Sequence, residues 1–267
     1  MSSTSAVQTF ADDIDARPIA ASYSDSVEQP LHCQQAGKVS CGNCRLSKIC
    51  LPLELQAPDI DRLNAIIQRG RPLQKGEFVY RAGQPFASVY AVRSGTLKAF
   101  SIGENGEEQV TGFYLPGEIF GLDGLCKSSY ASSAVALETA AICEIPFERL
   151  SELSALIPSL QRTFFQVMSK EIADDQQLLM MLSKNTAEQR VAALLLSIST
   201  RNARRRLSST SFRLPMSRTE IGNYLGLTVE TVSRVFSRFQ KSKVIAAEQR
   251  NVELLQPDRL RQVASGG

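Results

Sequence analysis

Three cysteines lie within ten residues of one another, in the pattern Cys41-x2-Cys44-x5-Cys50. The residues between them include a glycine, an asparagine and a serine, which allow a short segment to fold around an ion. Thiolates are strong metal ligands, and three of them in one loop favour a metal centre. The spacing therefore predicts that this loop supplies three ligands to a metal or a metal cluster.

The kind of metal centre depends on the remaining ligands. Structural zinc sites usually combine two pairs of closely spaced Cys or His ligands. The only histidine, His32, cannot by itself supply the second pair. Iron–sulfur clusters take several thiolates from one loop and commonly a fourth from far along the chain. The spacing leaves Cys33, Cys126 and Cys143 nearly equal as that fourth ligand. Cys143 fits a buried apolar cysteine equally well.

The chemistry open to these thiols depends on the cellular compartment, because a reducing cytoplasm disfavours disulfides. No run approaches the roughly 18 apolar residues that a membrane span requires, and the N-terminal residues lack a charged leader followed by an apolar block. We therefore expect a cytoplasmic protein with no membrane partner, in which clustered thiols bind metal rather than form disulfides. A redox enzyme would also need an acid or a base beside its thiols, and none is evident, so we expect no enzymatic activity.

A second motif lies between residues 214 and 245. Ser217 followed by Glu220 forms a capping box, which predicts the start of one short helix. Gly226 supplies a tight turn, and Thr228 can cap the start of a second helix. Two helices joined by so short a turn predict a helix-turn-helix.

The second of these helices has two chemically different sides. Its apolar side carries Val232, Val235, Phe236 and Phe239. Its polar side carries Glu230, Ser233, Arg234 and Ser237. Arginine binds guanine with two hydrogen bonds, and glutamate accepts one from the cytosine amino group. Serine can donate a hydrogen bond to a base or accept one from it. We therefore expect the polar side to read bases, with phosphate contacts from Arg238, Lys241 and Lys243.

Charge is distributed unevenly along the chain. From Lys184 onward, 15 Lys and Arg stand against 6 Asp and Glu, or +9, whereas the residues before it carry 15 against 21, or −6. A concentrated positive region suits double-stranded DNA, because neutralising phosphates releases condensed counterions. The basic stretch 201–206 lies between predicted helical segments, and its sequence fits either a solvated loop or a contact with the DNA backbone.

Short runs rich in Val, Tyr, Phe and Thr follow one another from Gly76 to Glu144. Turn signals interrupt them at Ala82-Gly83, Ser94-Gly95, Asn105-Gly106 and Pro116-Gly117. We expect antiparallel strands that close into a small jelly-roll β-barrel. The predicted fold class is α+β: a disordered tail (1–30), a cluster-binding segment with the barrel sensor domain (31–157), a dimerisation helix (158–184) and a winged helix-turn-helix domain (185–267).

The residues from Pro158 to Ser183 contain no other proline and no glycine, which predicts one long helix. A seam at alternating steps of three and four contains Phe165, Met168, Ile172, Asp175, Leu179 and Leu182. Such a seam predicts a partner helix from a second copy; the alternative is packing against the chain's own barrel. In a parallel pair the Asp175 carboxylates would repel each other, so the dimer would be marginal and easily switched.

Three segments carry a resemblance to a known family: CGNCRLSKIC, ALETAAICEIPFE and IGNYLGLTVETVSRVFSRFQKS. Over roughly residues 41–245 the chain resembles the fumarate and nitrate reduction regulators, the oxygen-sensing branch of the cyclic-AMP receptor protein superfamily. The resemblance implies a [4Fe-4S] cluster on Cys41, Cys44, Cys50 and Cys143, which oxygen degrades so that the dimer falls apart. It also implies base reading by Glu230, Ser233 and Arg234 at a palindrome like TTGAT-N4-ATCAA.

The chain also departs from this pattern. The tail before Cys33 is longer than the family leads us to expect, and Cys33 lies farther from the triplet than the usual extra cysteine. After GEIFGLDGL, the stretch SSYASSAVALE has no arginine where nucleotide-binding relatives clamp a phosphate, so we expect no cyclic-nucleotide binding. Activation of transcription requires a contact with RNA polymerase, for which the turn at Asn105 and Gly106 is a candidate.

Overall fold

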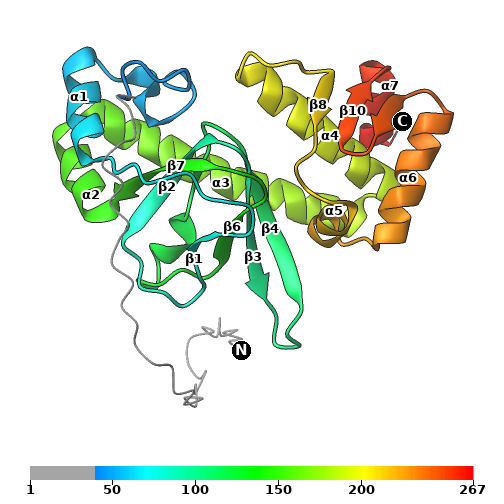
Figure 1. The fold of residues 1–267 in the computed structure, drawn as a ribbon, viewed down its shortest axis with the longest axis horizontal. Coiled ribbons are helices and arrows are strands. Elements are labelled where there is room, and N and C mark those ends of the chain that lie inside the picture. Colours follow the sequence, from blue (N-terminus) through cyan, green and yellow to red (C-terminus); the bar gives the residue numbers. More distant parts are fainter. Residues whose placement is uncertain (1–39, 267) are drawn as a thin grey trace, which may run out of the picture. The chain divides into compact units, whose positions relative to one another are not determined.

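Two antiparallel sheets form a sandwich in the first half of the chain (Figure 1). The computed structural model describes residues 40–266, so the predicted tail and Cys33 lie outside the described residues. The sheets have the strand orders β1-β6-β3-β4 and β5-β2-β7. Their strands are β1 (Phe78–Tyr80), β2 (Ser88–Ser94), β3 (Leu97–Ile102), β4 (Glu108–Tyr114), β5 (Ile119–Phe120), β6 (Ser133–Ala136) and β7 (Ala141–Pro146).

The expected jelly-roll layering is confirmed, but the strands do not close into one barrel. The edge strands β1 and β5 are only three and two residues long, which is too short to carry a ladder from one sheet to the other. The four predicted turns are present, each with a glycine in the left-handed region, at Gly83, Gly95, Gly106 and Gly117. At Gly95 a Cβ atom would also lie 2.5 Å from the carbonyl oxygen of Thr139, so only glycine fits there.

Aromatic rings fill the space between the sheets. The rings of Tyr80 and Tyr130 stack with centroids 3.9 Å apart, and Tyr90 and Phe120 stack at 5.4 Å. All four side chains are buried in one apolar cluster. The Tyr130 hydroxyl is satisfied locally, since it donates to the backbone oxygen of Ser88 at 2.7 Å. This interior is therefore a packed aromatic core.

Helices cover one end of the sandwich and lead out of it. They are η1 (Leu51–Glu54), α1 (Ala57–Ile66), η2 (Leu122–Gly124), α2 (Phe147–Leu156) and α3 (Pro158–Lys184). One buried cluster joins Leu51 of η1, Ile145 of β7 and Leu160 of α3. The predicted long helix α3 is confirmed; it begins at Pro158, whose missing N–H is tolerated in the first turn. Across the described residues, no helix is long and apolar enough to cross a membrane.

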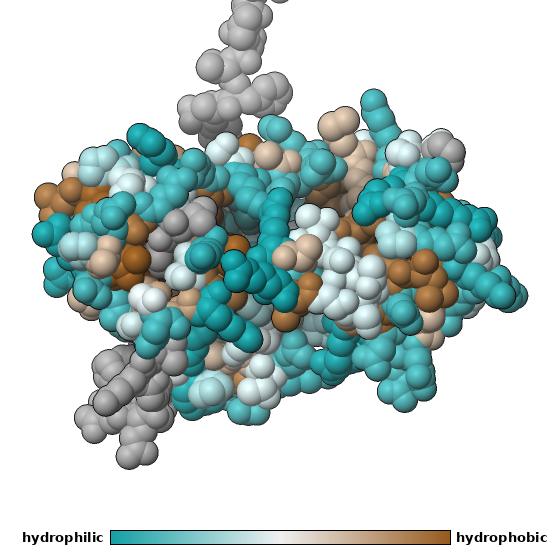
Figure 2. Space-filling model, turned by 90° about the horizontal axis from the view of Figure 1, so that it is seen from above, coloured by the Kyte–Doolittle hydropathy of each residue, from teal (hydrophilic) through white to brown (hydrophobic). Residues whose placement is uncertain are grey.

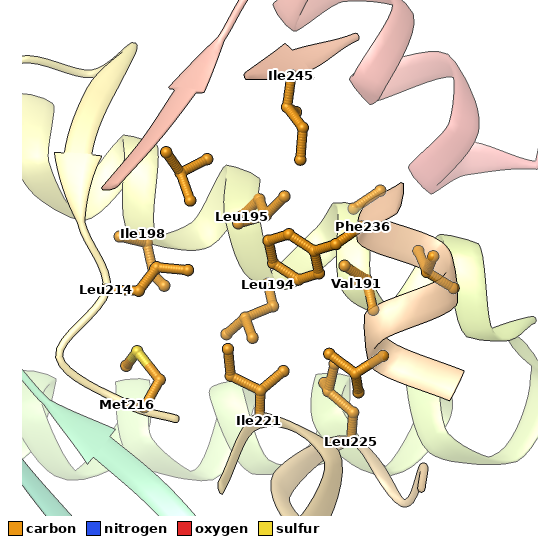
Figure 3. Packing of buried hydrophobic residues seen from close by; sticks show 14 of the residues in the cluster. Val191, Leu194, Leu195, Ile198, Leu214, Met216, Ile221, Leu225, Phe236 and Ile245 are labelled. Atoms are coloured by element: carbon orange, nitrogen blue, oxygen red, sulfur yellow. The ribbon is translucent and has the colours of Figure 1, made fainter. Parts of the chain in front are cut away.

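The rest of the chain folds around a second core (Figure 3). Its elements are α4 (Ala187–Arg204), β8 (Ser211–Arg213), α5 (Arg218–Leu225), α6 (Val229–Lys241), β9 (Ile245–Glu248), β10 (Asn251–Leu254) and α7 (Pro257–Ser265). The strands form the antiparallel sheet β8-β10-β9, which is the expected wing. Figure 3 shows Phe236 of α6 pointing among Val191 and Leu195 of α4, and Ile221 and Leu225 of α5.

The basic stretch 201–206 is mostly helical and is not a solvated loop. Two of its arginines pair with a carboxylate of this chain and are therefore not free to contact DNA. Helix α4 continues to Arg204, and Arg201 forms an ion pair with Glu118, which precedes β5. Arg205 lies 3.6 Å from the same carboxylate. Burial lowers the pKa of Arg205 to about 10, and Glu118 opposes that shift. The sequence alone did not indicate this pairing, because Glu118 lies more than 80 residues earlier in the chain.

Two further contacts connect the helix-turn-helix to the elements before it. Asn223 of α5 exchanges hydrogen bonds with β4, accepting from the backbone N–H of Val110 and donating to the carbonyl of Glu108. Arg190 of α4 donates to the carbonyls of Leu182 at 2.7 Å and Leu225 at 2.9 Å. Arg190 thus binds the C-terminal ends of α3 and α5 together, where carbonyls lack helical partners.

Candidate cluster site and nucleic-acid interface

All four cysteines named as cluster ligands line one pocket. Cys41, Cys44 and Cys50 come from the turns that precede η1, and Cys143 comes from the middle of β7. The turns are held by short backbone bonds, among them Ser47 N to Cys44 O at 3.0 Å and Cys50 N to Leu46 O at 3.0 Å. The pocket is mainly apolar, with Ile67, Ala91 and Ile145 among its lining residues. A local loop and a distant strand thus supply thiols to one space.

The pocket makes the thiols of Cys41, Cys50 and Cys143 poorer acids than an ordinary cysteine. Burial raises the pKa of Cys50 to about 12, and the neighbouring thiols of Cys143, Cys41 and Cys44 add to the shift. Burial also raises the pKa of Cys41 and of Cys143, while the Arg69 guanidinium lowers both. The four thiols share one pocket, and binding of a positively charged centre there would favour their thiolate forms. The donor set is therefore suited to a metal group.

The positions of the described ligand side chains indicate whether the pocket suits a single metal ion or a cluster. Within residues 40–266, no three His, Cys, Asp or Glu side chains lie close enough to hold a single metal ion. A four-iron cluster places each ligand sulfur on a different iron, so its ligands stand farther apart than those of one ion. Cys126 is exposed and does not line the pocket. Of the leftover cysteines that the structure describes, only Cys143 shares the space of the triplet.

The predicted seam of α3 is partly exposed in the single chain. Phe165, Ile172 and Leu179 are 59%, 59% and 66% exposed. Asp175 is exposed as well, and desolvation followed by the charge of Asp174 raises its pKa. Met168, in contrast, packs against the core of its own chain, and Leu182 is half-buried. Four of the six seam residues are thus free to meet a partner.

The exposed apolar side chains on α3 form a stripe along one helix. On the face drawn in Figure 2, hydrophobic residues lie in several separate patches among hydrophilic ones. The stripe on α3 differs from such scattered patches because its residues are spaced by three and four along the helix. Side chains with this spacing can pack against a second helix. The stripe on α3 is therefore the candidate surface for association.

The helix-turn-helix forms as predicted. Ser217 and Glu220 make the capping box that starts α5, with Ser217 N to Glu220 Oε2 at 2.7 Å. Gly226 ends α5 in the left-handed region, and Thr228 accepts a hydrogen bond from Thr231 N at 3.2 Å to cap α6. The apolar side of α6, which carries Val232, Val235, Phe236 and Phe239, is buried as expected.

The polar side of α6 is exposed at every predicted position. These residues are Glu230, Ser233, Arg234, Ser237 and Arg238. Ser233 donates to the carbonyl of Val229 at 2.8 Å, and Arg234 donates to Thr231 Oγ1 at 3.1 Å. Arg234 thus keeps most of its donors free, as a residue that reads a base edge requires.

Arg238 is not free in the same way, because its guanidinium forms an ion pair with Glu188 in the first turn of α4. We expect Glu188→Gln to raise the affinity for non-specific DNA by up to about fivefold, since an exposed pair of this kind contributes at most about 1 kcal/mol. Fluorescence anisotropy with a random duplex at several salt concentrations measures the change. Glu253→Gln, which removes a charge from β10, is the matched control; an equal gain with it would assign the effect to net charge alone.

Several residues of these sites were not identified from the sequence. Arg69 reaches the cysteine pocket, Glu188 pairs with Arg238, and Arg190 joins α3 to α5. Each acts on a residue of another element, so no local spacing indicates it. The only sequence signal for Arg69 is its position just after the apolar pair Ile66 and Ile67.

Comparisons with known proteins agree with this architecture. The Crp-like helix-turn-helix domain family matches residues 189–263, and the cyclic nucleotide-binding domain family matches residues 70–155. The structure is similar to that of FixK2 from Bradyrhizobium japonicum, with a TM-score of 0.68 and 27% identity over 74% of this chain and 97% of that one.

Curated relatives are closer in sequence. The transcriptional activator protein Anr of Pseudomonas protegens is 52% identical over 90% of this chain and 98% of its own length. The fumarate and nitrate reduction regulatory protein of Escherichia coli strain K12 is 45% identical over 85% of this chain and 90% of its own length. The chain therefore belongs to the family of the fumarate and nitrate reduction regulators, which are transcription regulators and not enzymes.

Proposed function

We propose that this protein is a cytoplasmic, oxygen-responsive transcription regulator that controls anaerobic gene expression. In this proposal a [4Fe-4S] cluster promotes dimerisation and binding to a palindrome like TTGAT-N4-ATCAA, and oxygen destroys the cluster and inactivates the protein. One observation carries the proposal: Cys143 of β7 lines the same pocket as the Cys41, Cys44 and Cys50 triplet. Among the described residues that line the pocket there is no Asp, Glu or His, and four thiols in such a lining suit a cluster better than acid–base catalysis.

The four cysteines would hold the cluster through their thiolates. When bound, a [4Fe-4S] cluster supplies a redox-active group whose destruction by oxygen is the signal. The apolar lining, which includes Ile67, Ala91 and Ile145, limits the access of water to the thiols.

The cysteine segment has a direct mechanical connection to α3. Cys50 is followed at once by η1, whose Leu51 is buried with Leu160 and Phe164 of α3. Because cores are close-packed, a shift of the cysteine turns displaces side chains that position the first half of α3. This connection supports the proposal that the state of the cysteine pocket changes the association of α3.

Association through α3 would bring two helix-turn-helix units onto one palindrome. The exposed Phe165, Ile172 and Leu179 supply the apolar contact, and Asp175 opposes it by repelling its own copy. Arg190 joins the C-terminal end of α3 to that of α5, so the position of α3 sets the position of α5. Two recognition helices fixed in this way match the two-fold symmetry of a palindrome.

Arg234→Ala tests the base-reading face. We expect a loss of about 1 to 3 kcal/mol in specific binding and relaxed discrimination at one guanine in each half-site, because the guanidinium would pair with guanine. Binding to a set of single-base variants of the palindrome measures both effects. Arg259→Ala, on α7, controls for the loss of charge. An unchanged base preference in Arg234→Ala would remove this residue from the reading face.

We further propose that the protein binds no cyclic nucleotide, despite its matching domain. The stacked rings of Tyr80, Tyr130 and Phe120 fill the interior of the sandwich, and they support this absence. RNA polymerase is the expected partner in activation, and the exposed hairpin turn at Asn105 and Gly106 is accessible for it.

Iron and acid-labile sulfide analysis tests the proposal directly. Protein purified without oxygen is expected to contain about four irons and four sulfides per chain and to show a broad visible absorption. Air should bleach this absorption and lower the affinity for the palindrome. Stoichiometric zinc, or a metal-free protein that binds the palindrome equally well in air, would refute the cluster as the sensor.

A further inference from the structure

We propose that Arg69 is the positioning residue of the cysteine pocket: it links the two chain segments that carry the cluster ligands and tunes the reduction potential and retention of the cluster. This inference rests on the proposed function. It assigns a role to a residue that lies 19 positions after the triplet and far before Cys143 in the sequence.

Arg69 contacts the triplet side of the pocket through its guanidinium. Its Nη2 donates to Cys41 Sγ at 3.5 Å and to Asn64 Oδ1 at 2.7 Å. The same Asn64 oxygen accepts the backbone N–H of Cys41 at 3.0 Å. Asn64 therefore holds both the start of the cysteine segment and the arginine that faces its thiol.

The backbone beside Arg69 is bound to the strand that carries Cys143. Gln68 N donates to Glu144 O at 2.8 Å, and Glu144 N donates to Gln68 O at 2.9 Å. This two-bond bridge brings Arg69 and Cys143 to the same pocket, where the charge of the guanidinium lowers the pKa of the Cys143 thiol. One side chain thus reaches ligands from both segments.

The guanidinium has donors to spare for such a role. Arg69 Nε is buried and has no hydrogen-bond partner in the described part of the chain. A buried unpaired donor on a charged group lowers the stability of the fold. A pocket that needs positive charge gives a reason for an arginine at this position despite that cost. Four thiolates bring four negative charges into a mainly apolar pocket, and hydrogen bonds to the sulfurs of an iron–sulfur cluster raise its potential. Arg69 supplies both the charge and the donors.

Arg93 offers an internal comparison. It lines the same pocket, and its charge also lowers the pKa of Cys143, but no hydrogen bond joins it to a thiol in the described residues. Arg93→Met therefore removes a charge from the pocket without removing the link between segments. Arg62→Met removes an exposed charge from α1, away from the thiols, and serves as the outer control.

The experiment compares Arg69→Met, Arg69→Lys, Asn64→Ala, Arg93→Met and Arg62→Met with the wild-type chain, all loaded without oxygen. The reduction potential of the cluster is measured by anaerobic titration, and cluster retention by the rate of iron transfer to a chelator. Arg69→Met should shift the potential to more negative values and release iron roughly 10- to 100-fold faster, the usual effect of losing a group that orients metal ligands. Asn64→Ala should shift both measurements in the same direction.

Arg69→Lys separates charge from geometry. Lysine keeps the charge but lacks the planar fork, so the potential should recover more than the retention of iron. Arg93→Met should shift the potential with little change in iron release, and Arg62→Met should change neither. If Arg69→Met does not fold, as judged by circular dichroism of the metal-free chain, Asn64→Ala and Arg69→Lys decide the question.

The outcomes distinguish the inference from the proposed function. A wild-type chain that takes up no iron would overturn the proposed function and this inference with it. A wild-type cluster whose potential and iron release are unchanged in Arg69→Met, or changed equally in Arg62→Met, would overturn the role of Arg69 alone. A negative shift with faster release, partly rescued by lysine, would support it.

Discussion

Cys143→Ser is expected to abolish cluster binding and, with it, specific DNA binding. Serine is nearly isosteric with cysteine, but its hydroxyl is a poor ligand for iron, so a pocket with three thiolates should retain little iron. Without a stable dimer, affinity for the palindrome should fall roughly 1000-fold or more, toward the level of non-specific binding. Iron and sulfide content, sedimentation and anisotropy on the same anaerobic sample measure all three effects.

Cys126→Ser is the matched control for that substitution. Cys126 is exposed and outside the pocket, so its loss should leave four irons per chain and wild-type affinity. If Cys143→Ser kept a full cluster and Cys126→Ser lost it, the fourth ligand would be Cys126. If both kept it, Cys33, which lies outside the described residues, would become the candidate.

Asp175→Leu should give a dimer that persists in air. Like charges placed opposite each other across an interface cost several kcal/mol, and burial already raises the pKa of Asp175 in the single chain. An apolar residue in the same register should tighten the dimer by about 100-fold or more. Sedimentation of the metal-free protein over a range of concentrations measures the dimer, and anisotropy in air measures its DNA binding.

Asp174→Leu provides the comparison for this effect. Asp174 lies beside Asp175 but forms an ion pair with Lys170 on its own helix. Its replacement removes the same charge and adds the same side chain outside the seam, so it should leave the metal-free chain monomeric. A monomeric Asp175→Leu, or equal dimerisation of the two variants, would contradict the repulsion account.

The helix-turn-helix was predictable because its signals are local. The Ser217 and Glu220 capping box, the turn at Gly226 and the cap at Thr228 each depend on residues within one helical turn. The period of 3.6 residues then decides which side of α6 is buried, and Phe236 and Phe239 lie on that side. The long helix α3 and the four glycine turns of the sandwich followed from equally short-range patterns.

The closure of the sheets and the partners of the charged groups were not predictable in this way. The strand pattern is the same for a barrel and a sandwich, and the short β1 and β5 decide between them only after the chain has folded. The arginines of the stretch 201–206 have the composition of a DNA contact, yet Arg201 and Arg205 meet Glu118. Arg238 likewise meets Glu188.

The sequence by itself determined the three-cysteine loop, the two helices of the helix-turn-helix and the long helix α3, because each is defined by spacing along one segment. Only the tertiary structure decided which leftover cysteine shares a pocket with the triplet, and that Arg69 reaches both sides of it. These contacts join residues that are far apart in the chain. Their distances depend on how β7, α1 and the cysteine turns pack together, and packing is a property of the whole core rather than of any local pattern.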